Sequence, residues 1–108
     1  MDKRIKKWLI KSHPEMKNAF KNKLDVYAFL ASKIFMVDYK ECGAYDLNNS
    51  IDGYVKPYVC TRLGQLYRRA AKMYALNAVC PTIDGMRDLR DILSEISISE
   101  IMNRGDAL

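Results

Sequence analysis

The sequence contains a single histidine, and its three cysteines form no C-x-x-C pair. A zinc site needs several Cys or His ligands at close spacing, and three widely spaced cysteines do not make a disulfide framework. We therefore expect no metal centre and reduced thiols at Cys42, Cys60 and Cys80. His13 has no second histidine or nearby cysteine beside it, so we expect neither a metal-binding nor a catalytic role for it.

The short motifs that mark common enzyme classes are also missing. The sequence has no GxxxxGK[ST] phosphate loop, no HExxH zinc motif and no GxSxG nucleophile turn. Asp46-Leu47-Asn48 has the spacing of the start of a calcium loop, but the later ligand positions and the closing glutamate are lacking. We expect no catalytic residue, no metal and no cofactor.

Long apolar runs are lacking as well. No run approaches the length that spans a bilayer, and the N-terminus does not have the pattern of a signal peptide. We expect a cytoplasmic protein that does not bind membranes. Hydrophobic residues make up 49% of the chain, which is enough for a modest core, so we expect residues 1–108 to form a single helical domain.

What the sequence does have is an uneven positive charge. Residues 1–24 hold eight Lys or Arg and two acidic residues, whereas residues 81–108 hold three Lys or Arg and six acidic residues. A basic front is typical of a nucleic-acid-binding protein, and equally of a protein whose charge only keeps it soluble. The candidate basic patch of the first expected helix consists of Lys3, Lys6, Lys7 and Lys11.

Periodicity and capping residues predict an all-α, mostly helical small bundle. We expect helices at residues 2–11, from a cap at Ser12, from Asp25 to about Met36, from about Thr61 to Val79, from Thr82 to about Ile96, and from a capping box at Ser97. A short helix or turn is expected at residues 38–45, and the last four residues are expected to fray. The inner stripe of the helix that starts at Thr82 is expected to be Ile83, Met86, Leu89 and Leu93.

The segment at residues 46–60 is expected to be an irregular loop or a short hairpin. Asp52-Gly53 favours a hairpin turn, with tyrosines and valines on either side of it. Tyrosines near a basic helix can stack on nucleic-acid bases, and more often they pack with their hydroxyl groups in water.

The helix expected from Thr61 to Val79 carries the candidate binding residues. Arg68 and Lys72 are four residues apart, so they project from the same face. Such a pair is either a solvated basic face or a phosphate clamp, since Arg supplies a fork of donors and Lys a point charge. The spacing does not decide between the two. With Arg62 and Arg69, this pair makes up the candidate phosphate- or nucleic-acid-binding site.

Several segments form an ordered series: Arg4–Leu9, Pro14–Phe20, Asp25–Phe35, Val37–Cys42 and Arg68–Lys72. In this order they resemble the fingers region of family A DNA polymerases, above all those of bacteriophages of Gram-positive bacteria. In that family a helix with Asp-hydrophobic-Tyr/His precedes a helix with Arg-x-x-x-Lys, and the phage members have a longer insertion between them. The resemblance covers about residues 4–80.

In the polymerase family the Arg and Lys of this motif hold the triphosphate of the incoming nucleotide. The resemblance places these roles on Arg68 and Lys72. It also shows departures, since Cys80-Pro81 stands where the family has a Tyr-Gly pair that stacks against the template base. The first metal-binding carboxylate would precede Met1, and the second, in a His-Asp-Glu type motif, has no counterpart. The resemblance therefore implies a non-catalytic chain.

The function favoured by this resemblance is that of a small phage-type protein derived from a polymerase fingers segment. It would bind and modulate a protein of host replication or defence in the bacterial cytoplasm, alone or as a homo-oligomer. One alternative is a nucleic-acid or nucleotide-phosphate-binding module that uses the basic helix face. Another is an accessory subunit of a split polymerase, which requires a separate chain with both carboxylates.

Overall fold

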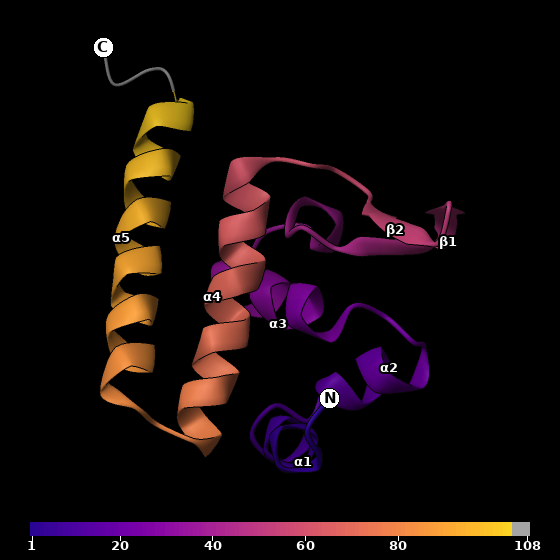
Figure 1. Cartoon of the computed structure of the whole chain (residues 1–108), viewed down its shortest axis with the longest axis horizontal. Coiled ribbons are helices and arrows are strands. Elements are labelled where there is room, and N and C mark those ends of the chain that lie inside the picture. The colour runs from indigo at the N-terminus through magenta and orange to yellow at the C-terminus, as the bar shows by residue number, and fades with distance from the viewer. Residues whose placement is uncertain (105–108) are drawn as a thin grey trace.

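The computed structural model describes residues 1–104, except for the side chains of residues 49, 50 and 104. The described part is mostly helical, with one antiparallel pair of strands (Figure 1). In chain order the elements are α1 (Lys3–Ser12), α2 (Met16–Lys21), α3 (Val26–Phe35), the 3₁₀ helix η1 (Tyr39–Glu41), β1 (Tyr45–Ile51), β2 (Tyr54–Pro57), α4 (Arg62–Val79) and α5 (Ile83–Arg104). A mostly helical fold is confirmed. It is not a pure all-α bundle, because residues 45–57 form a hairpin, one of the two forms expected for this segment. The expected fraying of residues 105–108 lies outside the described residues.

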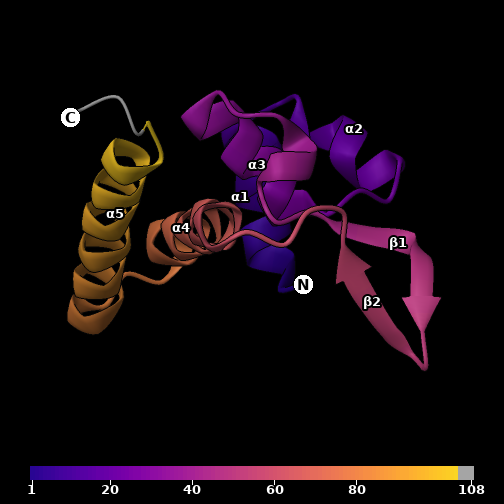
Figure 2. The same cartoon turned by 90° about the horizontal axis from the view of Figure 1, so that it is seen from above.

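Helix α4 lies at the centre of the molecule. It packs against α5 on one side and against α3 and α1 on the other (Figures 1 and 2). Its buried side chains recur at helical spacing, which gives one apolar stripe and leaves a polar face. The largest fully buried side chains of the surrounding core are Leu9, Met16, Leu30 and Cys42. Within residues 1–104, no helix combines the length and the apolar character that a membrane crossing needs.

The hairpin β1–β2 projects away from the helices (Figure 2). Ile51 pairs with Tyr54, so Asp52 and Gly53 are the two residues of the turn. Both have positive φ, 52° and 81°, as a tight two-residue hairpin turn requires, and Asp-Gly tolerates this conformation well. The expected turn is therefore confirmed.

The expected helix starts at Asp25, Thr61 and Thr82 are confirmed, because each of these side chains accepts a backbone N–H from the first turn of its helix. The expected start at Ser12 is wrong. Ser12 is the last residue of α1, and α2 begins only at Met16.

Helix α5 continues without a break to Arg104, so the expected end at Ile96 and the new cap at Ser97 are wrong. The Ser97 hydroxyl donates to the Leu93 carbonyl oxygen (3.2 Å), a bond inside the helix in place of a cap. Ile92 and Ile96 are buried one turn apart, so the apolar contact with α4 runs straight through the expected boundary.

The inner face of α5 also differs from the expected stripe. Gly85 is buried, and its carbonyl oxygen accepts a hydrogen bond from the Asn77 side chain of α4 (2.9 Å). This contact fixes the rotation of α5, and it turns Ile83, Met86 and Leu93 toward solvent; Ile83 is 73% exposed. Leu89 remains half-buried against the core.

Two glycines let α4 approach the turn before the hairpin. A Cβ atom added at Gly64 would lie 2.5 Å from the Glu41 carbonyl oxygen and 3.2 Å from the Gly43 nitrogen. Both contacts are with backbone, which cannot rotate away. The close approach brings the first turn of α4 beside the segment that leads into β1.

We expect Gly64→Ala to lower the free energy of unfolding by about 1–3 kcal/mol, because the clash outweighs the helix-propensity gain of roughly 1 kcal/mol. Urea unfolding followed by circular dichroism measures this change. Gln65→Ala, at the neighbouring exposed position, is the control and should stay within about 0.5 kcal/mol of wild type. A stabilised Gly64→Ala protein would contradict the close packing.

The three thiols differ sharply in environment. Cys42 is fully buried, whereas Cys60 and Cys80 are exposed, and all three are free. Burial, helped by the negative charges of Asp38 and Glu41, raises the pKa of Cys42 to about 11 from its ordinary 9.0.

At pH 8 we expect a thiol reagent to label Cys60 and Cys80 rapidly and Cys42 only after unfolding, as mass spectrometry of the labelled protein would show. Equally fast labelling of all three thiols in the folded protein would contradict this prediction.

Because folding raises the pKa of Cys42, the folded state holds the thiol proton more tightly. The stability that Cys42 contributes is therefore complete below pH 9 and is lost as the pH rises toward 11. A Cys42→Ala variant should lose this part of the pH dependence.

Candidate functional site

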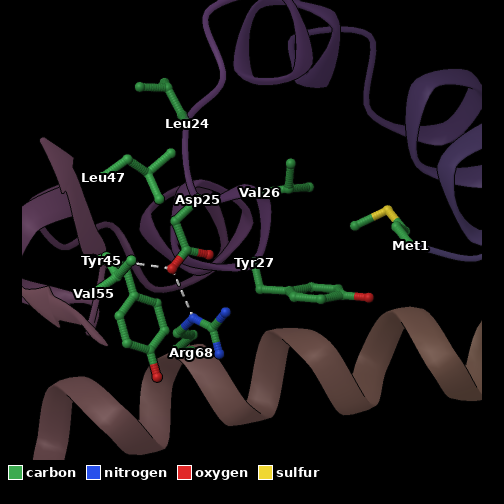
Figure 3. Close-up of a pocket in the computed structure, with 9 residues that line it drawn as sticks. All are labelled: Met1, Leu24, Asp25, Val26, Tyr27, Tyr45, Leu47, Val55 and Arg68. Atoms are coloured by element: carbon green, nitrogen blue, oxygen red, sulfur yellow. Dashed lines mark hydrogen bonds and ion pairs between the residues drawn. The ribbon is translucent and has the colours of Figure 1, made fainter. Parts of the chain in front are cut away.

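An ion pair between α3 and α4 forms the base of the candidate site. The Nε atom of Arg68 donates to Oδ2 of Asp25 over 2.9 Å (Figure 3). The Asp25 side chain is 5% exposed and that of Arg68 is 27% exposed. Arg68 is therefore not part of a plainly solvated face, which was one of the two interpretations of its spacing with Lys72.

The Asp25 carboxylate is satisfied from several directions. Its Oδ1 atom caps α3 at the Ala28 N–H, and its Oδ2 atom also accepts the N–H of Tyr45, the first residue of β1 (3.2 Å). The Asp25 N–H in turn donates to the Tyr39 hydroxyl oxygen (2.9 Å). Partial burial raises the pKa of Tyr39, although this hydrogen bond opposes the shift. One carboxylate thus joins α3, α4 and the hairpin.

Two tyrosine rings lie on either side of the Arg68 guanidinium (Figure 3). The Arg68 Cζ atom is 4.8 Å from the centre of the Tyr45 ring and 5.8 Å from that of Tyr27. The Nζ atom of Lys72 is 5.9 Å from the same Tyr27 ring. Such distances suit cation–π attraction. Partial burial raises the pKa of Tyr27, and the positive charge of Arg68 opposes this effect.

Two open pockets adjoin at Arg68 and Tyr45, which line both. The first, which we call the tyrosine pocket, has a volume of about 440 Å³ and is lined by Met1, Leu24, Asp25, Val26, Tyr27, Tyr45, Leu47, Val55 and Arg68. The second, which we call the basic pocket, has a volume of about 460 Å³ and is lined by Gly43, Tyr45, Pro57, Cys60, Gln65, Arg68, Arg69 and Lys72.

The basic pocket brings together three of the four candidate residues of α4. Arg69 and Lys72 are exposed, and within the described part of the chain neither forms an ion pair. Arg62, the fourth, does not line this pocket and instead donates to Glu95 of α5 (2.8 Å). Among the described residues, no carboxylate lines the basic pocket. It therefore offers positive charge without a competing negative group.

The four lysines of the candidate basic patch, Lys3, Lys6, Lys7 and Lys11, are all exposed on α1. Lys6 lies over the Phe20 ring, 5.1 Å from its centre. Among the residues that the structure describes, none of the four lines the tyrosine pocket or the basic pocket. They add to the charge of the molecule and do not belong to this site.

His13 packs against the aromatic side chains of Trp8 and Tyr74. Its Nε2 atom is 3.2 Å from the Tyr74 hydroxyl, and the rings of Trp8 and Tyr74 contact it edge-on. Across residues 1–104, no three His, Cys, Asp or Glu side chains gather as a metal site would require.

The sequence interpretation missed Tyr27 and Tyr45 as site residues and took Asp25 only as a helix cap. Asp25 and Arg68 are 43 positions apart, and no local pattern links them. The excess of tyrosines between positions 27 and 58 was the one signal that could have pointed to the site.

Comparison of the chain with protein-family models, with curated proteins and with solved structures gave no match. The resemblance to polymerase fingers therefore stays a prediction.

The ion pair leads to a prediction about stability. We expect Asp25→Ala to lower the free energy of unfolding by about 2–4 kcal/mol, because it removes a cap and leaves a half-buried arginine uncompensated. Asp25→Asn keeps a good capping side chain, so it should lower the free energy of unfolding by less than Asp25→Ala does. Urea unfolding measures both changes.

Asp38→Ala is the control, since the exposed Asp38 caps only the short η1 helix, through the Lys40 N–H (3.0 Å). Its cost should stay near or below about 1 kcal/mol. If Asp25→Ala cost no more than this control, the ion pair would not join α3 to α4 as described.

Proposed function

We propose that this protein is a non-catalytic binding protein that holds the phosphates of single-stranded nucleic acid in its basic pocket. The observation that carries the proposal is the contrast within α4. Arg62 and Arg68 are each neutralised by a carboxylate, whereas Arg69 and Lys72 line a pocket that has no carboxylate among its described lining residues. Unpaired cations of this kind are the usual contacts for phosphate oxygens.

The shape of the site supports a single strand over a duplex. The basic pocket is a recess beside an aromatic ring, and a flexible strand can place one phosphate in it while its bases remain free to stack. A duplex presents its phosphates on a convex surface with its bases already stacked. The net charge of +5 adds a general attraction to polyanions.

A protein partner is the second candidate, and a different surface favours it. Helix α5 leaves Ile83, Met86, Ile98, Ile101 and Met102 more than half exposed. Exposed apolar residues at this density are typical of interaction surfaces. This surface suits the expected role of modulating another protein, or a homo-oligomer, and it does not include the basic pocket.

The test of nucleic-acid binding is an affinity measurement with labelled single-stranded DNA at several salt concentrations. We expect Arg69→Ala/Lys72→Ala to weaken binding and to reduce the slope of log affinity against log salt by about 0.7, since the pocket holds one phosphate and each phosphate contact contributes about 0.7 on a single strand. Arg68 is left intact because it supports the fold.

The matched control is Lys7→Ala/Lys11→Ala, which removes the same charge from exposed positions on α1 that line neither pocket. It should leave the slope nearly unchanged. Equal losses in the two variants would mean attraction by net charge without a site. Absence of binding at low salt would contradict the proposal and direct the search to protein partners of α5.

A further inference from the structure

We infer that the tyrosine pocket receives a nucleobase, which stacks on the outward face of Tyr27 while the adjoining phosphate lies in the basic pocket. This inference rests on the proposed function and names the part of the nucleotide that the second pocket takes.

The lining of the tyrosine pocket suits the flat face of a base. Apart from the Asp25–Arg68 ion pair at its base, its walls are aliphatic or aromatic, and Leu24, Val26 and Leu47 lie above the two tyrosines in the view of Figure 3. Apolar walls with a few polar groups at one end are typical of pockets for small ring compounds. Its volume of about 440 Å³ lies within the usual range for such sites.

The Tyr27 ring is oriented for stacking. It lies flat above α4, with one face toward that helix and the opposite face toward the space between Val26 and Met1 (Figure 3). In Figure 3 the Arg68 guanidinium lies beside and below this ring, and the other nearby cation, Lys72, also belongs to α4. The outward face remains available to a base, and every base has a π-face that can stack there.

The polar groups at the base of the pocket do not oppose a base. The negative charge of Asp25 is compensated by Arg68, and its oxygens already accept two backbone N–H groups. Arg68 uses Nε for this pair, and in the described structure its two terminal nitrogens have no hydrogen-bond partner. These nitrogens can donate to a carbonyl oxygen or ring nitrogen at the edge of a base.

Arg68 and Tyr45 line both pockets, so the two pockets adjoin along one wall. A base and its own phosphate are joined through a sugar and must bind in neighbouring places. A lone apolar pocket fits many ligands, but an apolar aromatic pocket that adjoins a cationic one matches the two ends of a nucleotide.

The experiment compares the affinities of a short oligothymidylate and an abasic deoxyribose-phosphate chain of the same length. We expect the wild-type protein to prefer the chain with bases by about 5- to 100-fold, the usual size of one aromatic stacking contact. Tyr27→Leu should lose most of this preference while binding the abasic chain as well as wild type does.

Tyr54→Leu is the matched control, because Tyr54 is 76% exposed at the hairpin turn and lines neither pocket. It should keep the preference. Equal affinity of the wild-type protein for both chains, in a salt-dependent manner, would overturn the base site and leave phosphate binding in place. Absence of binding by either chain would overturn both proposals.

A second measurement uses the unaltered protein, so it does not depend on the folding of Tyr27→Leu. An oligonucleotide with a single 2-aminopurine should lose fluorescence on binding, because this base is quenched when it stacks. Binding without quenching at any position along the strand would overturn the base site.

Discussion

The ion pair between Asp25 and Arg68 joins three parts of the molecule at one carboxylate. Asp25 caps α3, Arg68 belongs to α4, and the third contact comes from the N–H of Tyr45, the first residue of β1. A buried carboxylate is tolerated only when its oxygens are hydrogen-bonded and its charge is compensated. The wall that the two pockets share consists of Arg68 and Tyr45, so the geometry of the site depends on this contact.

The features that could be predicted from the sequence are those decided by neighbouring residues. The caps at Asp25 and Thr82 and the Asp52-Gly53 turn each depend on contacts within a few positions, and local patterns signal them directly. The course of α5 could not be predicted in this way. A Ser-x-x-Glu pattern at Ser97 suits a capping box, but the burial of Ile96 against α4 kept the helix intact.

The candidate site could be predicted in part. Helical spacing placed Arg68 and Lys72 on one face, and the structure has both cations beside the Tyr27 ring. The spacing could not show that Arg68 has a partner, because Asp25 already had a sufficient local explanation as a cap. When a residue has a local role that explains its presence, the sequence does not indicate that it also makes a contact with a distant residue. The tyrosines had the same property, since each fitted a place in the core or the hairpin.

The positions that the polymerase resemblance treats as a pair are not equivalent here. A phosphate at Arg68 has to share the guanidinium with Asp25 and meets a group that is already stacked on Tyr45, with only the terminal nitrogens left to donate. Arg69 and Lys72 have neither constraint. The positive charge that is available to a ligand therefore lies on Arg69 and Lys72, while Arg68 holds the wall between the pockets in place. Because the proposed binding and the folding use different groups of the same pocket, we expect that charge can be removed from Arg69 and Lys72 without separating α3 from α4.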